Sequence, residues 1–228
     1  SGGAILGDRV RKQTHATDPN VFIRSMATRG ALGGLARSSF EATTVLDAMG
    51  YDVVLIETVG VGQDEVDVVE LAQSTAVVSI PGMGDDIQAI KAGILEIGDL
   101  FVVNKADLPG ADRVAKQLTA MLHLREPAED GWEPPIVKTE AERARGVDEL
   151  VDVMDAHRAH LETRGGLERK AVRRRERVFH DLLRERAAAS VLAGAPAGGA
   201  DVLAALRSGE LDPYAAVDEL MGSSEGPR

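Results

Sequence analysis

The stretch DLFVVNKAD, residues 99–107, joins a short apolar run to the polar tetrapeptide Asn104-Lys105-Ala106-Asp107. An apolar run of this length, bounded by polar residues, is typical of a strand that is buried on both faces of a parallel sheet. Residues 100–104 are therefore predicted to form such a strand, with the tetrapeptide in the turn at its end.

Asn-Lys-x-Asp at the end of a strand suits the recognition of guanine. The Asp107 carboxylate can accept hydrogen bonds from the ring N–H and the exocyclic amine, the Lys105 stem can lie over the base, and Asn104 can brace the loop. Adenine lacks that pair of donors and would leave the carboxylate unpaired, at a cost of roughly 1–3 kcal/mol. Taken alone, the tetrapeptide is also consistent with a strand-to-helix turn in which Asp107 caps the helix.

A second stretch, ETVGVGQ at residues 57–63, follows the apolar run of residues 51–56, which is also predicted to be a buried strand. An acidic residue at the end of a strand, followed three residues later by glycine, suits a metal-bound γ-phosphate. The Glu57 carboxylate would lie beside the magnesium shell, and the Gly60 N–H would approach the phosphate. Alone, this stretch is equally a strand that ends in a glycine turn. The two stretches together, in this order, favour a guanine nucleotide.

Strands and helices are predicted to alternate as far as residue 163. The strands are expected at residues 51–56, 75–80, 100–104 and 135–138, and the helices near 64–73, 87–97, 111–124 and 146–163. Buried strands separated by helical segments predict an α/β fold in which a mostly parallel sheet is flanked by helices. Residues 1–163 are assigned to this domain.

The composition narrows the classes of partner. The chain of 228 residues carries 26 Lys and Arg against 37 Asp and Glu, a net charge of −11, which argues against nucleic-acid binding. No run approaches the ~18 apolar residues of a membrane span, so no membrane contact is expected. The absence of cysteine excludes disulfides and thiolate metal sites, and agrees with the cytoplasmic location that we expect.

Residues 164–228 are predicted to form a separate helical arm. Arginine and glutamate are interleaved along residues 167–189, which favours a solvated helix with an apolar seam over a basic nucleic-acid helix. The seam consists of Val172, Phe179, Leu182 and Leu183. Residues 194–199 are predicted to be a linker. Two short helices follow, at residues 201–207 and from residue 212, and are expected to dock on another surface, such as another subunit.

One motif of nucleotide-binding domains is missing. The phosphate-binding loop Gly-x-x-x-x-Gly-Lys, followed by Ser or Thr, does not occur in the sequence. We expect the chain to be the C-terminal two-thirds of a longer protein; an intact protein that lacks this loop is the alternative. Without the loop, this chain alone is expected to bind nucleotide weakly and to be inactive.

Five segments in register resemble the MeaB/ArgK family of G proteins associated with methylmalonyl-CoA mutase. They are residues 1–9, 33–37, 57–63, 84–93 and 104–107. The resemblance implies a P-loop NTPase G domain with a C-terminal helical dimerisation extension. It also implies a slow, Mg²⁺-dependent GTPase that forms a homodimer. Its partner would be the adenosylcobalamin-dependent methylmalonyl-CoA mutase or a related cobalamin enzyme, which it would assist in cofactor loading and protection.

On the phosphate side, the resemblance assigns roles to four residues. Asp8 and Glu57 would lie beside the magnesium ion, Gly60 would face the γ-phosphate, and Lys91 would reach the nucleotide–metal site from a mobile segment. Gln63 is equally consistent with a water-positioning residue and with an ordinary polar residue.

On the base side, the resemblance assigns guanine recognition to Asn104, Lys105 and Asp107. It also assigns the backbone N–H of Ala141 to the guanine carbonyl. Glu140 stands where the family has serine.

Two other functions are open on the sequence. Nickel-delivery GTPases share the implied fold, and a metallochaperone needs soft or imidazole ligands at close spacing. His157 and His160 are one helical turn apart, but an exposed polar face is the simpler explanation of that pair. The second alternative is a scaffold that binds partners in a nucleotide-dependent way without hydrolysis, which the missing loop favours for this chain.

Overall fold

In the computed structural model, the described residues are 18–25, 34–58, 69, 71–82, 92–194 and 198–222. Internal contacts divide the chain into two compact units, Ser1–Arg174 and Arg175–Arg228. The domain boundary expected after residue 163 stays a prediction. In the first unit, helix α2 (Gly34–Ala48) precedes an alternation of strands and helices. These are β1 (Ala76–Ser79), α4 (Ala92–Ile97), β2 (Leu100–Asn104), α5 (Ala111–Leu122), β3 (Ile136–Thr139) and α6 (Val147–Thr163).

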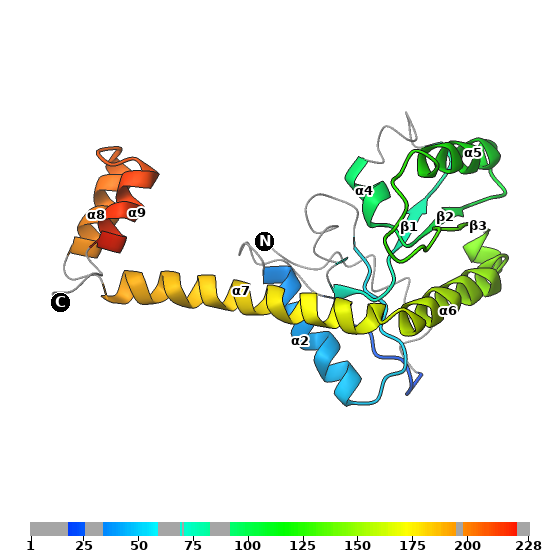
Figure 1. The fold of residues 1–228 in the computed structure, drawn as a ribbon, viewed down its shortest axis with the longest axis horizontal. Helices are drawn as coiled ribbons and strands as arrows, with labels where there is room; N and C mark the ends of the chain where they lie inside the picture. Colours follow the sequence, from blue (N-terminus) through cyan, green and yellow to red (C-terminus); the bar gives the residue numbers. More distant parts are fainter. Residues whose placement is uncertain are drawn as a thin grey trace. The chain divides into compact units, whose positions relative to one another are not determined.

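The three strands form a parallel sheet in the order β1-β2-β3. The register places Val78 beside Val102, and Asn104 beside Thr139. The four apolar residues of β2 are all buried, so both faces of this central strand are covered. Figure 1 shows the sheet between α5 and α6, which both contact β2 and β3. The prediction of an α/β fold with a parallel sheet flanked by helices is confirmed at this level.

A buried hydrophobic core lies between the sheet and α5. Phe101 and Val103 pack with Val114 and Leu118, which lie one turn apart on α5, and with Leu95 at the end of α4. Each large side chain buried in this way contributes on the order of 1.5–3 kcal/mol. On the other face, α6 buries His157 and Leu161. The core therefore fixes the carboxyl end of β2, where the polar tetrapeptide begins.

The prediction of a strand at residues 51–56 is wrong. These residues have no strand structure, and Val53 and Leu55 are 68% and 79% exposed. The run has the composition of a buried strand, but a strand also needs a hydrogen-bonded neighbour. Among the described residues, none pairs with it.

The other elements agree with the prediction to within a few residues wherever they are described. The strands at 75–80, 100–104 and 135–138 are present as β1, β2 and β3. Of the helix expected near 64–73, Leu71 is helical but residues 72–74 are not, so it ends earlier than predicted. Of the helix expected near 87–97, the structure describes Ala92–Ile97.

Helix α7 (Gly166–Gly194) crosses from the first unit into the second, which also contains α8 (Gly198–Ser208) and α9 (Pro213–Gly222). Of the linker predicted at residues 194–199, Gly194, Gly198 and Gly199 are helical, and residues 195–197 lie outside the described residues. Asp212 caps α9, since its Oδ1 accepts from the N–H groups of Tyr214 and Ala215 at 2.8 and 3.1 Å. No helix among the described residues is long and apolar enough to cross a membrane.

Candidate functional site

The carboxyl ends of β2 and β3 bring two loops together. Because the strands are parallel and Asn104 lies beside Thr139, the residues that follow each strand emerge at the same edge of the sheet. The first loop is the tetrapeptide 104–107, and the second comprises residues 140–146. This edge is where parallel α/β sheets hold their ligands.

Asn104 joins the two loops. Its Oδ1 accepts hydrogen bonds from the Thr139 hydroxyl at 3.0 Å and from the Ala141 N–H at 3.2 Å. A backbone bond from the Ala106 N–H to the Thr139 carbonyl, at 3.0 Å, runs beside them. Thr139 is 3% exposed, so its hydroxyl lies where an unpaired polar group would be costly. The Asn104 side chain therefore sets the spacing of the two loops.

The Ala141 N–H, predicted to donate to the guanine carbonyl, donates to Asn104 instead. A base carbonyl at this position would share the N–H with Asn104 or replace it. Donation from Ala141 to the guanine carbonyl therefore stays a prediction, and it requires that the bond to Asn104 be shared or replaced.

Lys105 has an unusual backbone conformation for a residue with a side chain. Its φ of 55° lies in the left-handed region, and its carbonyl accepts from the Leu108 N–H at 2.9 Å. A non-glycine residue costs on the order of 1–2 kcal/mol in this region. Such conformations are retained mainly at ligand-binding and catalytic sites, where the fold maintains them. The side chain is exposed at the edge of the sheet.

The Asp107 carboxylate is in contact with an arginine from the second loop. The Arg143 Nη1 donates to Asp107 Oδ2 at 3.1 Å and to Glu140 Oε2 at 3.0 Å. Arg145 also donates to Glu140 Oε2, at 3.2 Å. The hydrogen bond to Glu140, followed by the charge of Asp107, raises the pKa of the Arg143 guanidinium above its usual range. Two carboxylates and two arginines thus form a chain of ion pairs over this edge.

The shape of the second loop depends on Gly146. It has a φ of 70°, and a Cβ at this position would lie 2.1 Å from the Lys138 carbonyl oxygen. The loop is closed by backbone bonds between Glu140 and Arg145, at 3.0 and 3.3 Å. Only glycine fits there, because any side chain would strike the backbone of β3.

The phosphate side of the predicted site is less complete. Asp8, Gly60 and Lys91 lie outside the described residues, and Glu57 is described and exposed. No group of three or more His, Asp or Glu side chains forms a metal site in the part of the chain that the structure describes. The predicted magnesium ligands Asp8 and Glu57 therefore stay a prediction.

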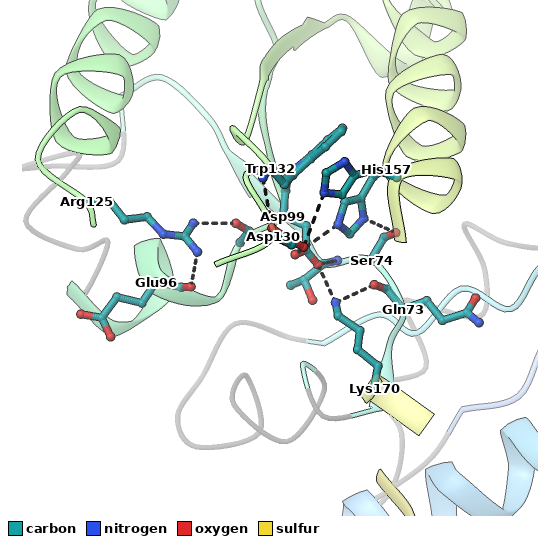
Figure 2. A network of polar contacts seen from close by, with 12 residues as sticks. Gln73, Ser74, Glu96, Asp99, Arg125, Asp130, Trp132, His157 and Lys170 are labelled. Atoms are coloured by element: carbon teal, nitrogen blue, oxygen red, sulfur yellow. Dashed lines mark hydrogen bonds and ion pairs between the residues drawn. The ribbon is translucent and has the colours of Figure 1, made fainter. Parts of the chain in front are cut away.

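The opposite edge of the sheet holds a polar network that the sequence did not reveal (Figure 2). Asp99, just before β2, accepts through Oδ2 from the Thr75 N–H at 2.8 Å and from Lys170 Nζ at 3.2 Å. Its Oδ1 lies 3.5 Å from His157 Nε2, and its carbonyl accepts from the Trp132 indole N–H at 2.7 Å. The network joins β1, β2, α6 and α7.

His157 is the buried centre of this network. Its side chain is 1% exposed, its Nδ1 lies 2.7 Å from the Ser74 hydroxyl, and its ring packs on Trp132 at a centroid distance of 4.8 Å. The interpretation of His157 and His160 as an exposed polar pair is therefore wrong for His157. Burial lowers the pKa of His157 below 6.5, while the charge of Asp99 acts in the opposite sense. The lowered pKa favours the neutral imidazole, whose contacts join α6 to the residues that precede β1 and β2.

The parallel sheet with its flanking helices places the chain in the α/β class, and hydrogen bonds to Asn104 join the two loops at its carboxyl edge. Comparison with known proteins agrees. The family described as methylmalonyl Co-A mutase-associated GTPase MeaB matches residues 1–195, and the chain belongs to this family.

Individual relatives support the same conclusion. A Pyrococcus abyssi protein that carries a provisional GTPase name is 46% identical over 224 residues, which cover 97% of this chain and 69% of the relative. GTPase ArgK of Escherichia coli is 39% identical over 66% of this chain and 46% of its own length. The mouse protein named methylmalonic aciduria type A homolog, mitochondrial, is 37% identical over 68% of this chain and 38% of its own length.

Proposed function

We propose that this protein, in a form that includes a phosphate-binding loop, binds and hydrolyses GTP and, in doing so, assists an adenosylcobalamin-dependent methylmalonyl-CoA mutase or a related cobalamin enzyme in cofactor loading and protection. The observation that carries the proposal is the pairing of the Asn104–Asp107 loop with the Thr139–Ala141 loop at the carboxyl edge of the sheet. Membership of a family described as mutase-associated GTPases supports the choice of partner.

The residues at this edge fit the base of a guanine nucleotide. Asp107 is a carboxylate that already accepts from an N–H of a planar guanidinium, and the guanine edge also presents coplanar N–H donors, although it carries no charge. Lys105 is exposed beside it, and Asn104 holds the loops at a fixed spacing. Magnesium, when bound, would offset the charge of the phosphates. Glu57, with Asp8, is the residue that we propose to hold it.

Calorimetric titration with GDP and ADP tests base recognition. We expect a preference for GDP, because adenine would leave Asp107 without its donor pair. The preference should be visible even if this chain binds weakly for want of a phosphate-binding loop. Equal affinities for GDP and ADP would contradict the proposal.

Single-turnover assays with and without the mutase test the chaperone role, using a protein that includes the phosphate-binding loop. Slow hydrolysis that accelerates when the mutase is added is the expected result, because transition-state charge can be offset by a group supplied in trans. A fast rate that the mutase leaves unchanged would count against it.

Homodimerisation through the second unit is the remaining part of the proposal. Phe179 and Leu183 are 59% and 51% exposed on α7, which supports an unburied packing seam. Each apolar side chain covered by a partner would contribute on the order of 1.5–3 kcal/mol, twice over in a two-fold interface. The double variant Leu182→Asp, Leu183→Asp should be monomeric by light scattering and retain GDP binding. A dimeric variant, or a monomeric unmodified protein at tens of micromolar, would refute the proposal.

A further inference from the structure

The ion pair between Arg143 and Asp107 lies on the carboxylate that is proposed to read the base. Asp107 and Arg143 are 36 residues apart, and their side chains are 40% and 59% exposed. Both groups are therefore accessible to a ligand that arrives from solvent. An N–H of Arg143 already occupies one acceptor oxygen of Asp107, Oδ2.

Resting on the proposed guanine site, we propose that Arg143 competes with the base for the carboxylate of Asp107. It occupies Asp107 when no base is bound, and guanine displaces it onto Glu140. Arg143 thereby sets the affinity of the site for guanine without being a ligand of the base.

Glu140 lowers the free-energy cost of this exchange. The same Nη1 that contacts Asp107 also contacts Glu140 Oε2, at 3.0 Å, so a displaced Arg143 keeps one of its two anionic partners. Glu140 is the better buried of the two carboxylate partners, with a side chain that is 19% exposed against 40% for Asp107. Its backbone is fixed by the bonds to Arg145 that close the loop. The movement required is therefore a change of side-chain rotamer and leaves the loop in place.

The exchange distinguishes bases. Guanine offers two donors to Asp107 and can replace the guanidinium. Adenine offers an unprotonated ring nitrogen at the corresponding place, so it gains nothing from a free carboxylate, and Arg143 stays on Asp107. Removing Arg143 should therefore strengthen guanine binding and leave adenine binding unchanged.

NMR titrations of the Arg143→Ala variant with GDP and ADP test the proposal, because this method measures weak binding. An exposed pair of this kind contributes little, so we expect GDP affinity to rise by about two- to fivefold, with ADP affinity unchanged. Arg143→Lys keeps the charge but not the planar guanidinium, so its GDP affinity should lie between those of the unmodified chain and Arg143→Ala. The matched control is Arg145→Ala, which removes the same charge from the same loop and the same Glu140 but not from Asp107. It should leave GDP affinity close to that of the unmodified chain.

Unchanged or weaker GDP binding in Arg143→Ala, or an equal gain in Arg145→Ala, would overturn the proposal. A nucleotide-free measurement separates this failure from failure of the guanine site itself. The Nε–Hε signal of Arg143 should shift between the unmodified chain and Asp107→Ala at low salt. If it does not shift, the competing contact is absent. If it shifts but neither GDP nor ADP is preferred, the proposed guanine function fails, and the competitor proposal fails with it.

Discussion

The two edges of the sheet carry polar clusters of similar composition, but the amino-edge cluster has a buried centre, His157, and the carboxyl-edge cluster is more exposed. At the carboxyl edge, Asp107 and Arg143 pair with side chains that are 40% and 59% exposed. At the amino edge, Asp99 contacts Lys170 and lies beside His157, whose side chain is 1% exposed. An ion pair in water contributes little to stability, whereas a buried polar group is costly to leave unpaired. The second cluster therefore holds the elements together, while the groups of the first are accessible to solvent.

The edges also differ in backbone conformation. The carboxyl edge contains Lys105, Ala144 and Gly146 with φ between 52° and 70°. At the amino edge, the strands continue into residues whose backbone groups bond to one another, such as Asp99 N–H to the Thr75 carbonyl at 2.9 Å. Lys105 and Ala144, the two described non-glycine residues with positive φ, thus both lie at the carboxyl edge.

The largest expected effect is at the amino edge. His157→Ala removes a buried ring packed on Trp132 and leaves the Ser74 hydroxyl without its partner. We expect a loss of about 3 kcal/mol in the free energy of unfolding, measured by urea denaturation. Arg143→Ala at the other edge should leave the urea midpoint nearly unchanged. Equal losses in the two variants would remove the distinction between the edges.

Gly146→Ala should have the next largest effect, and it acts at the carboxyl edge. The new Cβ would meet the Lys138 carbonyl oxygen at 2.1 Å and force the second loop away from β3. We expect a loss of about 2 kcal/mol in stability, together with weaker GDP binding. Gly131→Ala is the matched control, because Gly131 has a similar φ of 75° with nothing within 4 Å of its Cβ position. If both variants behave alike, the steric argument for Gly146 does not hold.

The smallest effect is a dependence of stability on pH. Burial lowers the pKa of His157 in the folded chain below 6.5, so the unfolded chain takes up a proton at higher pH than the folded chain does. The contribution of His157 is therefore complete above about pH 6.5 and declines as the pH falls below that value. The groups that face it are Asp99, Lys170, Asp130 and His160.

Urea titrations between pH 7.5 and 5 should show this decline in the unmodified chain and a smaller one in His157→Gln. His123→Gln, which changes an exposed histidine, should retain the full decline. A decline of the same size in all three proteins would exclude His157 as its source.

The sequence indicated the carboxyl edge better than the amino edge, for a physical reason. The run 100–104 is short, apolar and bounded by polar residues, so both the strand and the loop after it were predictable from local sequence. The amino-edge network joins residues that are far apart, since Ser74 and His157 are separated by 83 positions. No local pattern signals such a contact, and a histidine one turn from another resembles an exposed pair.

The same limit explains why the strand predicted at residues 51–56 is wrong and why the contact of Arg143 with Asp107 was not predicted. Residues 51–56 are apolar enough for a strand, but pairing depends on a neighbour that composition cannot supply. Arg143 reaches Asp107 only because the register of β2 and β3 brings their loops together. Local sequence predicted what each loop contains, and the sheet decides which groups meet.

The most direct test of the central claim, that the carboxyl edge reads guanine through Asp107, is the base preference of Asp107→Asn. An amide donor in place of the carboxylate suits the added carbonyl of xanthine, so calorimetry should show the variant favouring XDP over GDP by at least about tenfold. The unmodified chain should favour GDP over both XDP and ADP. If Asp107→Asn keeps the same order of base preference as the unmodified chain, Asp107 does not read the base, and the account of this edge is wrong.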